Sequence, residues 1–217
     1  MTLIVGIDEA GRGPVIGPLV ICGVLIDEKD EIKLKNIGVK DSKLLTPKQR
    51  EDLFEKIRSI VKKYEILIIQ PKDIDSFVES DHLNLNWLEA NVSAGIINKL
   101  APNKAILDCP SVNTNAYRDY IKKQIEGDVE IIAEHKADVN YPVVSAASIL
   151  AKVTRDDEIE KIKKAIGVDF GSGYPSDEKT QNFLKNNWKK YPEIFRKSWS
   201  TYKVLADSLK QKKIGEF

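Results

Sequence analysis

The chain has 217 residues, with 34 basic and 33 acidic side chains, and its formal net charge is +1. Its 42% hydrophobic and 31% charged residues are typical of a globular protein with an ample core and exclude a disordered chain. No apolar run is long enough to span a bilayer. Two cysteines are too few for a disulfide framework, and the N-terminal residues lack the features of an export signal. We therefore expect a cytoplasmic protein with no membrane attachment.

Short apolar segments alternate with longer amphipathic ones along the chain. Segments rich in Ile, Val and Leu predict five strands, at Leu3–Ile7, Leu19–Ile26, Tyr64–Ile69, Lys104–Leu107 and Val129–Ala133. Apolar residues at helical spacing predict helices at Pro47–Val61, from Leu85 to near Leu100, and after Pro142. Thr46 is the expected N-cap of the first of these helices. With a helical tail after them, these elements predict an α/β domain with a mixed sheet.

The near-neutral total hides an uneven distribution of charge. Between Lys179 and Lys213 the chain has ten basic and two acidic side chains, a local charge of +8, which leaves −7 for the rest. Aromatic residues are interleaved with these cations, at Phe183, Trp188, Tyr191, Phe195, Trp199 and Tyr202. One interpretation is a helical subdomain with an aromatic core and a solvated lysine face. The other is a surface that binds nucleic-acid phosphates, which the net charge alone would not suggest.

The first predicted strand runs into two adjacent acids and a glycine-rich loop. Asp8 and Glu9 are followed by Gly11-Arg12-Gly13. On a regular strand the two acids would point to opposite faces, so both serve one site only if the strand ends or bends there. The glycines allow backbone N–H groups to approach a bound phosphate or sugar. The third glycine of a dinucleotide-binding fingerprint is missing.

Two further acids also follow predicted strands. Asp108 ends the strand Lys104–Leu107, and Asp138 follows the strand Val129–Ala133. Functional groups gather at the carboxyl ends of strands in open α/β sheets, and carboxylates gathered there repel one another unless divalent cations are bound. We therefore predict a site for Mg²⁺ or Mn²⁺, with two cations, formed by Asp8, Glu9, Asp108 and Asp138. Such a site suits hydrolysis of a phosphodiester.

A series of motifs resembles type 2 ribonuclease H, or ribonuclease HII, in its archaeal single-chain form. In chain order they are Asp8–Pro14 with Gly17-Pro18, Asp41-Ser42-Lys43, Asp108, Ser145–Val153 with Arg155-Asp156, and Gly173-Tyr174-Pro175. The resemblance covers nearly the whole chain. It implies a ribonuclease H-like mixed sheet flanked by helices, with a C-terminal helical extension. It also implies metal-dependent cleavage 5′ of ribonucleotides in RNA–DNA hybrids and in ribonucleotide-containing duplex DNA, leaving 3′-hydroxyl and 5′-phosphate ends.

The same resemblance implies roles for individual residues. The four acids would be metal ligands, and the Gly11-Arg12-Gly13 loop would read the ribose 2′-hydroxyl, the group that distinguishes RNA from DNA. Tyr174 would contact the neighbouring sugar. The other expected contacts with the substrate backbone are Lys43 and Asn84, with Asn86 in a competing register. Lys152 and Arg155 lie about one helical turn apart, and this spacing predicts a shared face toward either the phosphate or the acidic cluster. The segment Arg196–Trp199 resembles a family segment near the substrate, and a purely structural role for Trp199 is equally open.

We expect a monomer with residues 1–170 as the catalytic domain and 171–210 as a substrate-binding helical extension. Residues 211–217 resemble the peptide by which replication and repair proteins bind the sliding clamp. The resemblance rests on the spacing of Gln211, Ile214 and Phe217. A frayed terminus is the alternative for so short a match.

Two other functions are compatible with parts of the pattern. One is a resolvase- or transposase-type nuclease that uses the same acidic cluster on DNA. The other is a catalytically silent subunit that binds nucleic acid or the clamp, although acids at all four positions argue against it.

Overall fold

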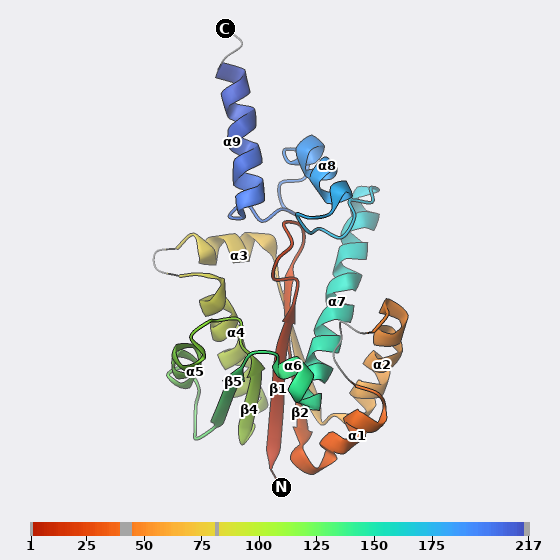
Figure 1. Cartoon of the computed structure of the whole chain (residues 1–217), viewed down its shortest axis with the longest axis vertical. Coiled ribbons are helices and arrows are strands. Elements are labelled where there is room, and N and C mark those ends of the chain that lie inside the picture. Colours follow the sequence, from red (N-terminus) through yellow and green to blue (C-terminus); the bar gives the residue numbers. More distant parts are fainter. Residues whose placement is uncertain (1, 40–44, 81–82, 215–217) are drawn as a thin grey trace. The chain divides into compact units, whose positions relative to one another are not determined.

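The computed structural model describes residues 2–39, 45–80 and 83–214 (Figure 1). The chain forms two compact units: residues 1–10, 20–68 and 85–155 make the first, and residues 11–19, 69–84 and 156–217 make the second. The second unit thus begins before residue 171 and includes two early segments. The reason is apolar packing, since Val15 and Ile16 share a buried cluster with Phe170, Phe183 and Phe195.

The first unit is built on a five-stranded mixed sheet with the order β3-β2-β1-β4-β5. The strands are β1 (Leu3–Ala10), β2 (Leu19–Asp27), β3 (Lys63–Ile69), β4 (Lys104–Asp108) and β5 (Glu130–Glu134). β1 pairs antiparallel with β2 and parallel with β4, which pairs parallel with β5. The five predicted strands and the mixed sheet are confirmed.

Helices cover this sheet. They are α1 (Glu31–Asn36), α2 (Pro47–Ile60), α4 (Leu85–Leu100), α5 (Thr114–Lys122), α6 (Ala137–Asn140) and α7 (Pro142–Ile166), with a 3₁₀ turn, η1, at Glu28–Asp30. Thr46 caps α2 as predicted, in a reciprocal capping box with Gln49. Among the residues that the structure describes, no helix has both the length and the apolar character needed to cross a membrane.

Two glycines show which helix lies on which face of the sheet. A Cβ on Gly6 would come within 2.4–2.5 Å of the backbone of Val143 and Val144, where α7 begins. A Cβ on Gly23 would lie 2.3 Å from the side chain of Ile96 in α4. Gly23 pairs with Ile7, the residue after Gly6. Because successive residues of a strand face opposite sides, α7 and α4 pack on opposite faces of the sheet.

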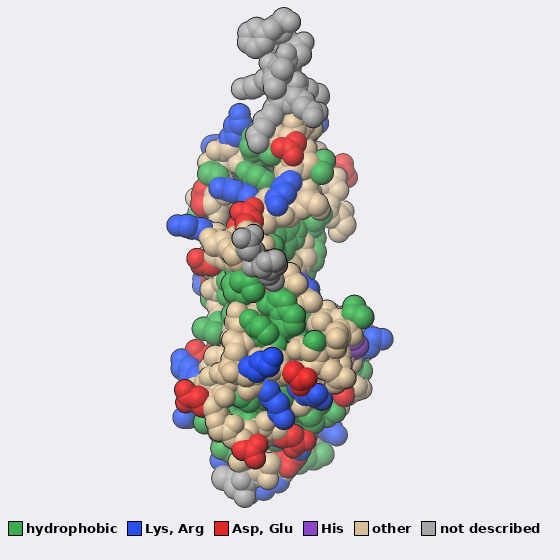
Figure 2. All heavy atoms as spheres, turned by 90° about the vertical axis from the view of Figure 1, so that its left-hand side faces the viewer, with side chains coloured by type: hydrophobic (Ala, Val, Ile, Leu, Met, Phe, Trp, Pro, Cys, Tyr) green, Lys and Arg blue, Asp and Glu red, His purple; other side chains and the backbone are tan. Residues whose placement is uncertain are grey.

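The second unit contains α3 (Pro71–Val78), α8 (Glu178–Asn187), α9 (Ser200–Ile214) and the end of α7. Its core is aromatic: Phe183 is buried and stacks on Tyr191, with ring centroids 6.0 Å apart. The aromatic residues of the basic segment therefore build this core, as the structural interpretation predicts. On the face shown in Figure 2, acidic and basic side chains are interspersed rather than sorted into a patch of one sign.

Candidate active site

Asp8 and Asp108 lie at the same level of two neighbouring strands. Ile7 of β1 is paired in parallel register with Leu107 of β4, so the next residues, Asp8 and Asp108, are adjacent. They share the sheet face of Gly6, the face covered by α7. Asp8 is 4% exposed, and the charge of Asp108 acts on its carboxyl group. The structure thus brings together two of the four predicted acids.

The first half of α7 supplies polar partners to this pair. Ser148 is fully buried, and its side chain hydrogen-bonds the Asp8 carboxylate. The Lys152 Nζ donates to Ser148 Oγ at 2.6 Å. Burial raises the pKa of Asp8 to about 6, and Asp108 adds to the increase, while the positive charge of Lys152 and the hydrogen bond from Ser148 oppose it. A second positive charge beside the pair would favour the ionised form of Asp8.

Glu9 lies on the other face of the sheet. β1 stays regular through Ala10, which pairs with Val20, so the strand neither ends nor bends at the two acids. The charge of Glu9 acts on Cys109 and on Tyr117 of α5, as does the charge of Glu89 of α4. Burial raises the pKa of both Cys109 and Tyr117, and these charges raise it further. The regular pleat turns the Glu9 side chain to the face opposite that of Asp8, and a role of Glu9 as a metal ligand stays a prediction from the sequence.

Asp138 lies in α6, directly after the residue that holds Asp108. The N–H of Ala137 donates to Asp108 Oδ1 at 2.9 Å and so fixes that carboxylate at the start of α6. Asp138 itself is 1% exposed, and the hydroxyl of Ser145 donates to its backbone carbonyl. Asp138 therefore directly follows Ala137, the residue whose N–H binds the Asp108 carboxylate.

The donor set of this site suits a hard cation. Among the described residues, no three His, Cys, Asp or Glu side chains lie close enough together to hold a metal ion. The paired carboxylates of Asp8 and Asp108 nevertheless fit one Mg²⁺ or Mn²⁺, because such ions commonly take one or two protein carboxylates and keep several waters. A cation between them would also relieve the repulsion that contributes to the raised pKa of Asp8.

The glycine loop and Tyr174 come together in the second unit. The N–H groups of Val15 and Ile16 both donate to the carbonyl of Gly173, at 2.9 and 3.3 Å. A Cβ on Gly13 would lie 3.4 Å from Cε1 of Tyr174, so the tyrosine ring borders the loop. Tyr174 is 38% exposed. Two elements that the sequence predicts to contact a sugar are thus neighbours.

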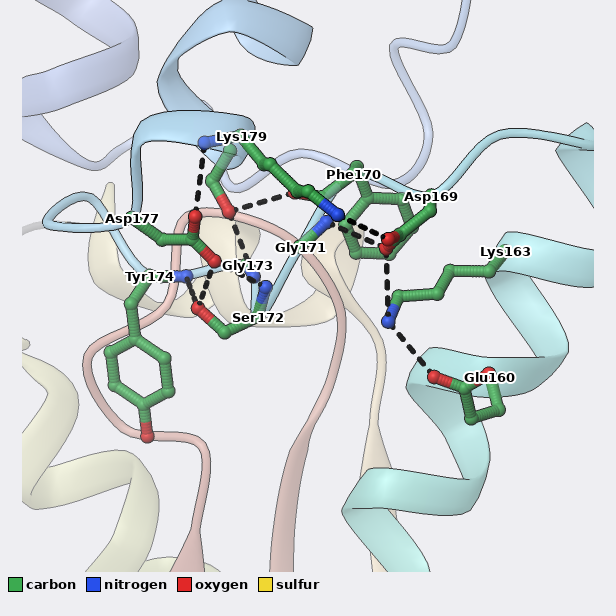
Figure 3. Close-up of polar contacts among 11 residues, drawn as sticks. Glu160, Lys163, Asp169, Phe170, Gly171, Ser172, Gly173, Tyr174, Asp177 and Lys179 are labelled. Atoms are coloured by element: carbon green, nitrogen blue, oxygen red, sulfur yellow. Dashed lines mark hydrogen bonds and ion pairs between the residues drawn. The ribbon is translucent and has the colours of Figure 1, made fainter.

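Asp177 holds the loop that carries Tyr174. Its Oδ2 accepts hydrogen bonds from the N–H and the hydroxyl of Ser172, both at 2.7 Å, and its Oδ1 accepts from the N–H of Lys179 at the start of α8. Figure 3 shows these contacts, with the ring of Tyr174 pointing away from them. Asp169 adds an ion pair with Lys179, at 2.9 Å. Asp177 therefore fixes the backbone conformation of the segment that includes Tyr174.

Replacing Asp177 by Asn is expected to lower the melting temperature by a few degrees at pH 7. The N–H of Ser172 and its hydroxyl hold the pKa of Asp177 below its usual value. A carboxylate with a lowered pKa stabilises the fold above its unfolded-state pKa, and this contribution disappears as the pH falls through its folded-state pKa. The difference between wild type and Asp177→Asn should therefore shrink in acid. Thermal melts between pH 2 and 7 test this, with exposed Asp157→Asn as the control; a constant difference would contradict it.

The remaining predicted residues are placed as follows. Arg155 is buried in α7, one turn after Lys152. Asn84 is exposed and directly precedes α4. Gln211 and Ile214 fall within the bounds of α9. Lys43 and Phe217 lie outside the described residues.

Two residues of these sites were not predicted individually from the sequence: Ser148 and Asp177. Ser148 lies four residues before Lys152, a helical spacing that could have indicated its contact with that lysine. Asp177 directly precedes a helix, and an N-cap signal could have identified it.

Comparisons with known proteins identify the family. The sequence profile of ribonuclease HII matches residues 5–202. The ribonuclease HII of Pyrococcus furiosus is 50% identical over 213 residues, which are 96% of this chain and 93% of that protein. The crystal structure of ribonuclease H2 from Pyrococcus horikoshii matches with a TM-score of 0.88 and 46% identity, over 96% of this chain and 99% of the other. The RNase HII in the PCNA:RNase HII complex from Archaeoglobus fulgidus matches with a TM-score of 0.83 and 40% identity, over 91% and 95%. The chain belongs to the ribonuclease HII family, the metal-dependent endoribonucleases that act on RNA–DNA hybrids.

Proposed function

We propose that this enzyme cleaves the phosphodiester on the 5′ side of a ribonucleotide, both in RNA–DNA hybrids and in duplex DNA with embedded ribonucleotides, and leaves 3′-hydroxyl and 5′-phosphate ends. The observation that carries the proposal is the pairing of Asp8 and Asp108 at one level of two parallel strands, beside Ser148 and Lys152. A carboxylate pair with a nearby ammonium suits a site that holds a cation and an anionic phosphate together.

Asp8 and Asp108 are the proposed ligands of Mg²⁺ or Mn²⁺. When bound, the cation supplies charge stabilisation to the phosphate and makes a water more acidic. The chain holds the ligands ready: Ser148 orients Asp8, and the N–H of Ala137 orients Asp108. A second cation, with Asp138 and Glu9 among its ligands, remains a prediction from the sequence.

The sugar contacts are proposed for the second unit. The Gly11-Arg12-Gly13 loop would meet the 2′-hydroxyl, and the ring of Tyr174, which borders Gly13, would meet the neighbouring sugar. Lys152 and Arg155 are proposed to face phosphate from α7. Asn84 and Lys43 are proposed to contact the nucleic-acid backbone, as their place in the family motifs implies.

The test is digestion of a DNA duplex that carries one ribonucleotide, with both product ends mapped and the divalent cation varied. The proposal predicts a single cut 5′ of the ribonucleotide in Mg²⁺ or Mn²⁺ and none in EDTA. Cleavage of the matched all-DNA duplex would favour a resolvase-type nuclease instead. Binding without cleavage in any cation would favour the silent subunit.

The C-terminal peptide is proposed to bind a sliding clamp. The spacing of Gln211, Ile214 and Phe217 supports this, as does the A. fulgidus relative, whose structure is a complex with PCNA.

Deleting residues 211–217 should eliminate clamp binding without changing the nuclease rate, because the deletion removes the apolar anchors and leaves both proposed sites intact. Calorimetric titration of the clamp from the same source, with cleavage rates measured in parallel, tests this. Substitution of Lys210, just before the peptide, serves as the control. Unchanged clamp binding after the deletion would show that the clamp is bound elsewhere.

A further inference from the structure

A buried arginine binds the inner side of the glycine loop. Arg196 is fully buried in the second unit. Its Nη2 donates to the carbonyl of Gly11 at 2.6 Å, its Nη1 to that of Arg12 at 3.1 Å, and its Nε to that of Gly17 at 3.0 Å. One guanidinium thus binds three backbone carbonyls of one loop, an arrangement for which its planar fork of donors is suited.

Trp199 binds the next carbonyl in the loop. Its Nε1 donates to the carbonyl of Gly13 at 3.2 Å, and its ring lies against the Arg196 guanidinium, 4.8 Å from ring centroid to Cζ. Arg196 and Trp199 together, here called the loop anchor, therefore bind the carbonyls of three consecutive residues, Gly11, Arg12 and Gly13.

This pattern fixes where the loop's N–H groups point. In a planar trans peptide the carbonyl of one residue and the N–H of the next point in opposite directions, and the described chain has no cis peptide. With the carbonyls of Gly11 and Arg12 turned toward Arg196, the N–H groups of Arg12 and Gly13 must point away from it. The next residue, Pro14, has no N–H. Gly11 takes the required backbone conformation, with φ at 85°.

The loop anchor is itself held in place. The N–H of Arg196 donates to the carbonyl of Val15 at 2.9 Å, and the preceding residue, Phe195, bridges to Ile16. On its other side, Asp75 of α3 accepts hydrogen bonds from the N–H groups of Lys197 and Ser198, at 2.8 and 3.0 Å. The anchor is therefore fixed before any substrate arrives, and little ordering is left to occur on binding.

We infer that Arg196 and Trp199 are positioning residues for ribose recognition: they contact no substrate, and they aim the N–H groups of Arg12 and Gly13 at the 2′-hydroxyl. The inference rests on the proposed function, in which this loop meets the sugar. On this inference the preference for ribose depends on the hydrogen bonds from Arg196 and Trp199 to the loop carbonyls, on the side of the loop opposite the N–H groups of Arg12 and Gly13. Lysine cannot replace Arg196 in this role, because a single ammonium cannot bind three carbonyls in the geometry of the fork.

The test compares binding of two duplexes that are identical except for one ribonucleotide, measured by fluorescence anisotropy in EDTA so that no strand is cleaved. Trp199→Phe removes the indole N–H together with part of the bicyclic ring, and keeps an aromatic side chain at this position. Trp188→Phe is the matched control, since Trp188 packs on Tyr202 in the same unit. Arg196→Lys is the stronger variant, and Trp199→Phe carries the test if Arg196→Lys does not fold.

We expect wild type and Trp188→Phe to prefer the ribonucleotide duplex, and Trp199→Phe to lose about fivefold to tenfold of that preference while binding the all-DNA duplex normally. A merely structural role would weaken binding to both duplexes equally and leave their ratio unchanged, and that result would overturn the inference. Absence of any preference in wild type would instead overturn the proposed function, and the inference with it.

Discussion

Asp8→Asn is expected to lower the cleavage rate by at least about 10²–10³-fold, because it removes a charged oxygen ligand from the pair with Asp108. The fold should persist. Asparagine has nearly the same shape, and burial already disfavours the charge of Asp8, whose pKa it raises to about 6. The melting temperature of the metal-free protein should therefore stay the same or increase.

Single-turnover cleavage of the one-ribonucleotide duplex measures this effect, with thermal melts in EDTA alongside. Asp157→Asn, an exposed carboxylate on the same helix as Lys152, is the control and should cleave at the wild-type rate. Activity of Asp8→Asn within a few-fold of wild type would contradict the site assignment.

Gly6→Ala is expected to destabilise the protein by about 2–4 kcal/mol. The added Cβ would meet backbone atoms of Val143 and Val144 at 2.4–2.5 Å, and backbone cannot move aside as a flexible side chain can. Either β1 or the start of α7 must shift, which would also move Asp8 relative to Ser148.

Gly95→Ala provides the matched control. Gly95 is exposed within α4, and a Cβ there would meet nothing within 4 Å. Alanine should stabilise that helix by about 0.5–1 kcal/mol. Urea denaturation of both variants measures the two changes; a Gly6→Ala protein as stable as wild type would contradict the close packing of α7 on β1.

Most of the sheet could be predicted from the sequence because its strands are short, apolar and bounded by turn residues. α2, α4 and α7 could be predicted because their apolar residues recur at helical spacing. α1 has six residues and α6 four, too few for a periodic pattern to appear. α3, at Pro71–Val78, begins at a proline and buries Asp75, whose role depends on Lys197 and Ser198 far along the chain.

The candidate site could likewise be predicted only in part from the sequence. Asp108 ends β4 as the sequence predicts, whereas β1 continues two residues beyond Asp8, so the predicted end of that strand was too early. The separation of Glu9 depends on β1 staying paired with β2 through Ala10, which is set by the register of β2 rather than by the motif itself. Arg196 binds a loop about 180 residues earlier, and no local pattern predicts such a contact.

Calorimetric titration of Mn²⁺ into wild type, Asp8→Asn, Asp108→Asn and the control Asp157→Asn tests directly whether the Asp8–Asp108 pair holds the catalytic cation. If Asp8 and Asp108 hold the catalytic cation, wild type and the control will bind Mn²⁺ and both site variants will lose that binding. Equal Mn²⁺ binding by all four proteins would contradict the assignment of the cation to this pair.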